Sequence, residues 1–202
     1  MILLFEYSAE THNSRLALMK GIETEVKVEI TSPALFRRKL RESGFRIHRR
    51  RVFERNAMFE TDPPSLRPRG CVVRLREAGN RFTITYKGPA NVGKHKSREE
   101  IEFTVSDAGA AQEFLGRLGY QSKFIYEKYR TEYMVQNSNG IVTLDETPIG
   151  VYAELEGEEK WIDSTARILG IADKDYITAS YGALYLRWCD KEGQDPGHMR
   201  FR

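Results

Sequence analysis

Charged and apolar side chains alternate along residues 21–30, and this pattern constrains the fold more than any other feature of the sequence. Successive side chains of a β-strand point to opposite faces, so every second residue shares a face. The pattern therefore predicts a strand with one ionic and one apolar face. The ionic face holds Glu23, Glu25, Lys27 and Glu29, and the apolar face holds Ile22, Val26, Val28 and Ile30.

The same alternation returns in six later segments, at residues 73–76, 83–87, 98–103, 128–132, 144–145 and 153–156. A sheet with one face on the core and the other in water would explain any single strand of this kind. Arginine and glutamate at two-residue steps in strand after strand favour a closed barrel whose ionic face points inward. Buried charges need partners or a ligand, so such a lumen suits a polyanion together with a divalent metal.

Three segments carry the start and stop signals of helices. The first follows the N-cap Ser32 and stops at Gly44, and the second follows Ser106 or Asp107. The third spans roughly 158–170, and all three need apolar sheet surface to pack on. The residues expected to supply the buried stripes are Ala111, Phe114, Leu115 and Leu118 in the second helix and Ile162, Ala166 and Leu169 in the third.

A weak internal repeat relates the two halves of the chain at a constant offset. It pairs Glu25 with Glu100 and Arg55 with Arg130, and it gives each half the order strand, helix, three strands. We therefore expect an α+β fold: an eight-stranded, mostly antiparallel β-barrel with helices packed outside.

Composition limits the partners and the compartment that this chain can have, and local sequence patterns indicate the bounds of its domain. A net charge of +3 over 202 residues excludes an overall basic nucleic-acid binder. No segment approaches the roughly 20 apolar residues that span a bilayer, so no membrane is expected as a partner. Cys71 and Cys189 make no disulfide framework, which indicates a reducing, cytoplasmic compartment. Residues 1–18 are predicted to be a disordered arm, 19–188 the domain, and 189–202 a flexible tail.

The charged segments occur as ordered motifs that resemble the CYTH superfamily, which includes class IV adenylate cyclases, thiamine triphosphatases and inorganic tripolyphosphatases. The hallmark ExExK stands at residues 23–27, and the later motifs are VRLRE at 73–77, TYKGP at 85–89, SREEIE at 97–102, EKYR at 127–130, LDE at 144–146 and AELE at 153–156. The resemblance covers residues 19–188. Ser180 and Tyr181, followed by Leu184 and Leu186, are more similar to the cyclase-type branch.

The resemblance implies a triphosphate tunnel and assigns roles to residues of this chain. It implies Mg²⁺ or Mn²⁺ held by Glu23, Glu25, Asp145, Glu154 and Glu156, and a triphosphate held by Lys27, Arg74, Arg76, Lys87, Lys128 and Arg130. Glu25 and Lys27 are the implied catalytic pair. Arg55 joins the triphosphate set only through the internal repeat, and Glu100 and Glu102 are either metal ligands or partners of the basic residues.

The implied function is a metal-dependent enzyme of the class IV adenylate cyclase type, which converts ATP to cyclic AMP and pyrophosphate. Hydrolysis of tripolyphosphate or thiamine triphosphate is the alternative, and a non-catalytic polyphosphate or nucleotide binding module is a third reading. The tunnel residues do not separate these, and the sequence alone identifies no purine pocket at either mouth. A homodimer is left open.

Overall fold

The computed structural model describes residues 19–202, so the arm expected over residues 1–18 lies outside the described part of the chain. The strands are β1 (Met19–Glu29), β2 (Arg46–Glu60), β3 (Val72–Ala78), β4 (Arg81–Lys87), β5 (Asn91–Val92), β6 (Lys96–Val105), β7 (Gln121–Met134), β8 (Ile141–Thr147) and β9 (Gly150–Glu156). The helices are α1 (Pro33–Glu42), α2 (Ala108–Arg117), α3 (Glu159–Ile168) and α4 (Tyr181–Glu192), and two 3₁₀ turns are η1 (Arg67–Arg69) and η2 (Asp173–Asp175).

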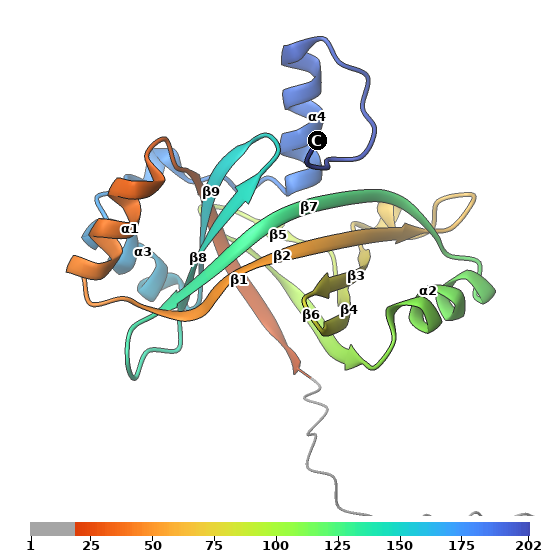
Figure 1. Ribbon diagram of the computed structural model, residues 1–202, viewed down its shortest axis with the longest axis horizontal. Coiled ribbons are helices and arrows are strands. Elements are labelled where there is room, and N and C mark those ends of the chain that lie inside the picture. Colours follow the sequence, from red (N-terminus) through yellow and green to blue (C-terminus); the bar gives the residue numbers. More distant parts are fainter. Residues whose placement is uncertain (1–18) are drawn as a thin grey trace, which may run out of the picture.

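The sheet closes on itself as a barrel (Figure 1). Its strand order is β1-β9-β8-β7-β2-β3-β4-β6, and β1 also pairs with β6 to complete the circle. Every one of these pairings is antiparallel, while the two-residue β5 is a side branch on β6. The predicted eight-stranded barrel with helices outside is thus confirmed.

The apolar strand faces mostly point outward, and helices cover parts of them. Leu40 of α1 and Ile162 of α3 are fully buried against the outer faces of β1, β8 and β9. Ala166 and Leu169, near and just after the end of α3, are buried in the same cluster, as the apolar stripe predicts. This arrangement leaves the alternate, charged side chains of the strands inside the barrel.

Helix α2 buries less of its apolar stripe than the sequence predicts. Ala111 and Leu115 are buried beside β3, but Phe114 is 61% exposed and Leu118 is 58% exposed. Leu118 is the C-cap, where the chain leaves the helix. Phe114 lies about 100° around the helix axis from Leu115. A single short helix on a curved sheet therefore buries only a narrow stripe.

The C-terminal residues are ordered, in contrast to the flexible tail expected over residues 189–202. Helix α4 continues to Glu192 and buries Cys189, and the following chain returns to β7. There the backbone N–H of Met199 donates to Ile125 (3.0 Å), and its C=O accepts from Glu127 (2.8 Å). Met199 itself is 1% exposed. Composition favours disorder here, but backbone pairing and an apolar anchor outweigh it.

The C-terminal chain can pair with β7 because β2 and β7, the two longest strands, extend beyond the ends of their neighbouring strands. They lie side by side along the barrel (Figure 1). Strand β7 pairs with β8 only from Tyr129 onward, so its earlier edge is free to receive the tail. Strand β2 pairs with β3 only from Glu54 onward, and its residues 46–53 pair within the described chain with β7 alone.

Candidate functional site: an ionic tunnel

The interior of the barrel is a cavity of about 1750 Å³, lined by side chains from all eight closed strands. Six of the seven basic residues in the predicted triphosphate set line it: Lys27, Arg74, Arg76, Lys87, Lys128 and Arg130. Most of them are nearly inaccessible to solvent, and Lys128 is 1% exposed. Such charges are stable in a barrel only because carboxylates stand beside them.

Arg55 is the exception and does not line the cavity. Its neighbours Glu54 and Asn56 point inward, so the alternation of β2 turns Arg55 outward. There its guanidinium forms an ion pair with Glu77 of β3. The internal repeat aligns Arg55 with Arg130, but Arg130 points into the lumen whereas Arg55 points to the outer face of the barrel. Its assignment to the triphosphate set is corrected on this ground.

Asp145 is a counter-ion of the basic residues. Its carboxylate is fully buried and accepts hydrogen bonds from Lys128 Nζ (2.8 Å), Arg130 Nε (2.7 Å) and the Tyr181 hydroxyl (2.6 Å). Its three donor side chains make this carboxylate a counter-ion in the described structure, and a cation could bind it only by replacing them. This departs from the metal-ligand role expected for Asp145.

The glutamates of β1 are also paired with basic residues, which lie on the adjacent strand β6 and on the next strand, β4. Glu25 contacts Lys96 (2.7 Å), and Glu23 contacts Lys87 (2.6 Å) and Arg98 (3.2 Å). Burial alone would raise the pKa of Glu25, but the nearby lysines more than offset this and hold the pKa below its ordinary value. Lys96 and Arg98 were not predicted, although Arg98 belongs to the ionic alternation of β6.

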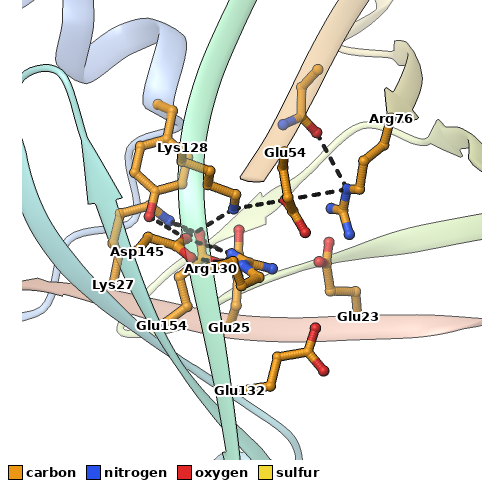
Figure 2. A network of polar contacts seen from close by, with 12 residues as sticks. Glu23, Glu25, Lys27, Glu54, Arg76, Lys128, Arg130, Glu132, Asp145 and Glu154 are labelled. Carbon is orange, nitrogen blue, oxygen red and sulfur yellow. Dashed lines mark hydrogen bonds and ion pairs between the residues drawn. The ribbon is translucent and has the colours of Figure 1, made fainter. Parts of the chain in front are cut away.

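Lys27 and Arg130 meet at Glu154 on β9. Lys27 Nζ lies 2.7 Å from one carboxylate oxygen, and Arg130 contacts the other. Figure 2 shows these residues as a continuous network with Lys128 and Asp145. The attraction of Lys27 and Arg130 outweighs the effect of burial and keeps the pKa of Glu154 well below its usual range.

Glu100 and Glu102 of β6 stand beside basic residues. Glu100 lies 2.7 Å from Lys87, and Glu102 accepts a hydrogen bond from Thr85 (2.9 Å) and lies 3.6 Å from Arg74. These contacts match the second of the two roles left open for them, that of orienting the basic residues.

Glu54 of β2 is the most deeply buried acid that the sequence did not point out. It is fully inaccessible, 3.6 Å from Arg76 and 3.7 Å from Lys128, and neither of its oxygens has a hydrogen-bond partner. Figure 2 shows it between these two cations. Burial works against its ionisation, but the surrounding cations lower its pKa to about 2. The sequence does not single out Glu54, because the adjacent Arg55 is also charged and the pattern alone does not show which of the two faces the lumen.

Glu156 differs from the other lumen acids. It lies opposite Glu25 on the neighbouring strand, and it makes no ion pair within residues 19–202. Burial, together with the carboxylates of Glu23 and Glu154, raises its pKa to about 7. A carboxylate that is costly to ionise among other carboxylates is a place where a cation would be stabilising.

The donor set of β1 and β9 fits a hard divalent cation by its chemistry. Glu23, Glu25, Glu154 and Glu156 present only carboxylate oxygens, which are preferred by Mg²⁺ and Mn²⁺. In the described residues no three acidic, histidine or cysteine side chains are already gathered around one point. Most of these acids are instead held by lysine or arginine, so a cation would have to replace those partners.

Aromatic residues form a layer above the ions at the α4 end. The Tyr181 ring lies over the ammonium groups of Lys27 (4.7 Å) and Lys128 (5.0 Å), and it contacts Tyr126 and Tyr152. Its position follows from the segment before α4, where Ile177 pairs with the backbone of Lys27. The sequence pattern around Tyr181 does not by itself predict this position above the lumen.

The fold and the site together define a tunnel domain, a closed antiparallel barrel whose lumen holds ion-paired acids and bases. The chain belongs to the CYTH domain family, whose model matches residues 21–181. The barrel with outer helices is the fold of that family's tunnel.

Individual relatives agree with this assignment. A protein of Methanocaldococcus jannaschii named "Putative adenylate cyclase" is 26% identical over 148 residues, which cover 73% of this chain and 83% of that protein. A Pyrococcus horikoshii protein of known structure superposes with a TM-score of 0.68 at 26% identity, covering 82% of this chain and 98% of the other. A Hippeastrum structure, described as a "putative adenylyl cyclase" with a dominant triphosphatase activity, superposes at 0.59 with 18% identity, over 86% of this chain and 97% of that one.

Proposed function

We propose that this protein is a divalent-metal-dependent enzyme that acts on triphosphate compounds, with conversion of ATP to cyclic AMP and pyrophosphate as its leading reaction. The observation that carries the proposal is the buried basic set of Lys27, Arg74, Lys87, Lys128 and Arg130, which converges on one cavity. Phosphate oxygens are the natural partners of such a set, since guanidinium forks match them and lysines act as point charges. The name of the M. jannaschii relative supports the cyclase reading.

The residues of the tunnel would act by positioning and by electrostatic stabilisation. The arginines and lysines hold the phosphates and stabilise the negative charge that develops on the leaving group. Glu23, Glu25, Glu154 and Glu156 are the residues that would hold a divalent cation. When bound, that cation supplies neutralisation of phosphate charge. No nucleophilic side chain is needed, because either the ribose 3′-hydroxyl or water attacks.

The ion pairs explain why metal and triphosphate should bind together. Within the tunnel Lys27 is held by Glu154, and Lys87 by Glu23. A triphosphate that takes the lysines leaves these glutamates buried without counter-ions, which is strongly unfavourable. A divalent cation on the glutamates removes that cost. Each ligand therefore raises the affinity for the other, and this coupling is necessarily reciprocal.

Product analysis tests the proposal directly. The full chain is incubated with ATP, tripolyphosphate or thiamine triphosphate, each with Mg²⁺, Mn²⁺ or excess chelator. Cyclic AMP and pyrophosphate would support the cyclase, whereas orthophosphate from any of the three would support a triphosphatase instead. Tight binding without turnover would instead support a non-catalytic binding module. Full turnover in chelator would contradict metal dependence.

The cellular setting and the partner that we propose rest on less specific features of the chain. In residues 19–202 no helix is long and apolar enough to cross a membrane. Cys71 and Cys189 are both free thiols, which is consistent with the proposed cytoplasmic setting. A small-molecule triphosphate is the partner that this tunnel would take.

A further inference from the structure

Asp145 of β8 is buried among basic residues that a triphosphate would also use (Figure 2). Its two oxygens accept hydrogen bonds from Lys128 and Arg130 of β7. The glutamates of β1 and β9 can exchange their lysines for a divalent cation, as proposed above. Asp145 needs another form of compensation when phosphates draw its basic partners away, because a buried carboxylate that loses its donors is strongly unfavourable.

Tyr181 gives Asp145 a third donor, which carries no charge. Its hydroxyl donates to Asp145 Oδ2 at 2.6 Å, and Lys128 Nζ donates to the same oxygen at 2.8 Å. Burial and the carboxylates of Asp145 and Glu154 raise the pKa of Tyr181 well above its usual value, so the hydroxyl keeps its proton. Phosphate attracts a neutral hydroxyl less strongly than an ammonium or guanidinium group. We therefore expect the hydroxyl to stay on Asp145 when the cations turn toward a ligand.

The ring of Tyr181 contacts two of the lysines that line the cavity. The Nζ atoms of Lys27 and Lys128 lie 4.7 Å and 5.0 Å from the ring centroid, within the range of cation–π attraction. A single side chain thus contacts two lysines through its ring and Asp145 through its hydroxyl. Removal of the hydroxyl alone separates these two roles.

The position of Tyr181 is set by the chain around it. Tyr181 is the first residue of α4 and is 6% exposed. Just before the helix, the N–H of Ile177 donates to the C=O of Lys27 (2.7 Å), and its C=O accepts from the N–H of Lys27 (3.0 Å). The ring centroids of Tyr126 and Tyr152 lie 5.9 Å and 5.8 Å from that of Tyr181. The hydroxyl is therefore directed at Asp145 before any ligand binds.

We propose that Tyr181 is a positioning residue for triphosphate binding, whose hydroxyl stabilises Asp145 while the basic residues of β7 engage the phosphates. This inference rests on the proposed function and deepens it, because it assigns a role to a side chain that need not touch the phosphates. In the empty tunnel Asp145 also has Lys128 and Arg130 as donors, so loss of the hydroxyl is partly compensated there. In the occupied tunnel it is not, and binding should weaken.

The test measures binding of tripolyphosphate and of ATP to the full chain, by equilibrium titration at low temperature with Mg²⁺. Tyr181→Phe removes the hydroxyl and keeps the ring beside the lysines. Tyr176→Phe is the matched control, because it removes a hydrogen bond of the same kind, from Tyr176 to Asp163 (3.2 Å), at a tyrosine that does not line the cavity. Since hydrogen bonds to charged groups are stronger than those between neutral groups, Tyr181→Phe should weaken binding roughly three- to 30-fold.

A double-mutant cycle asks whether this effect passes through Asp145. In Asp145→Asn the buried charge is absent, so the further change Tyr181→Phe should alter the affinity by less than about twofold. A general structural defect at Tyr181 would instead weaken binding by the same factor in both backgrounds. If Asp145→Asn does not fold, the comparison of Tyr181→Phe with Tyr176→Phe decides alone.

The expected result is weaker triphosphate binding in Tyr181→Phe and wild-type affinity in Tyr176→Phe. Wild-type affinity in Tyr181→Phe, an equal loss in Tyr176→Phe, or full additivity with Asp145→Asn would overturn the inference while leaving triphosphate binding by the wild-type chain intact. Failure of the wild-type chain to bind either ligand would overturn the proposed function as well.

Discussion

Glu25 and Glu156 lie directly opposite each other on β1 and β9, yet Glu25 contacts two lysines while Glu156 makes no ion pair within residues 19–202. The substitution Glu25→Gln should therefore destabilise the chain, because it leaves Lys96 buried without its charged partner. Breaking a buried pair costs about 3–5 kcal/mol, which for this length lowers Tm by roughly 6–20 °C. Thermal unfolding measures this, and an unchanged Tm would contradict the pairing.

The substitution Glu156→Gln should have the opposite effect on stability. Because burial and neighbouring acids raise the folded-state pKa of Glu156 to about 7, its ionisation opposes folding above the unfolded value of 4.5. The wild-type chain should lose stability relative to Glu156→Gln as pH rises from 4.5 to 7. Tm measured across this range checks the sign. A difference that is flat with pH would show that Glu156 is ionised normally.

Both variants should lose metal-dependent turnover, although their effects on stability differ. Removal of one electrostatic stabiliser from a reaction of this kind typically costs about 100- to 1000-fold in kcat. Rates are measured as a function of Mg²⁺ with the substrate that the product analysis identifies. A wild-type rate and metal dependence in either variant would remove that glutamate from the proposed metal site.

Substitution of the arginines that line the lumen should affect triphosphate binding, whereas substitution of the outward-facing Arg55 should not. Arg74→Ala and Arg130→Ala would each remove a proposed charge-assisted phosphate contact worth roughly 1.5–3 kcal/mol, so triphosphate affinity should fall about tenfold to a hundredfold. Arg55→Ala, on the neighbouring outer face, should leave the affinity unchanged. Equal losses in all three would indicate a diffuse field instead of contacts inside the lumen.

Glu54 should make the chain sensitive to acid. Its folded-state pKa of about 2 lies below the unfolded value of 4.5, because the attraction of Arg76 and Lys128 outweighs burial. Its contribution is present above pH 4.5 and is lost as pH falls toward 2. The Tm advantage of wild type over Glu54→Gln should shrink over that range, and an advantage that does not change with pH would contradict the lowered pKa. Tripolyphosphate should also stabilise Glu54→Gln more than wild type, since the added phosphate replaces the missing charge.

Much of the barrel could be predicted because alternation is a local property of each strand. The ionic face of β1 and the buried stripe of α3 are both visible in a few consecutive residues. The parity of β2 could not be predicted in the same way, since Arg55 and Glu54 are both charged and only the pairing with β3 and β7 decides which one faces inward.

The ion-pair partners of the charged residues could not be predicted from the sequence either. That Asp145 is surrounded by Lys128, Arg130 and Tyr181 depends on three segments that are distant in sequence. The order of the tail depends on how far β7 extends beyond β8, which is a property of the assembled sheet. Sequence patterns predicted which residues carry charge, and the closed barrel determined which charges meet.

The unequal lengths of β2 and β7 also determine which strand edges of the barrel are open. An unpaired strand edge is a template for another chain, and it invites edge-to-edge aggregation. On β7 the tail fills the exposed edge. On β2 the overhang of residues 46–53 carries Arg46, Arg49, Arg50 and Arg51 and is interrupted by two irregularities in its register with β7. Arg49 and Arg51 have ion-pair partners in Glu132 and Glu146. Like charges directly opposite each other on two strands are destabilising, so Arg46 and Arg50 would oppose the pairing of this overhang with an identical edge.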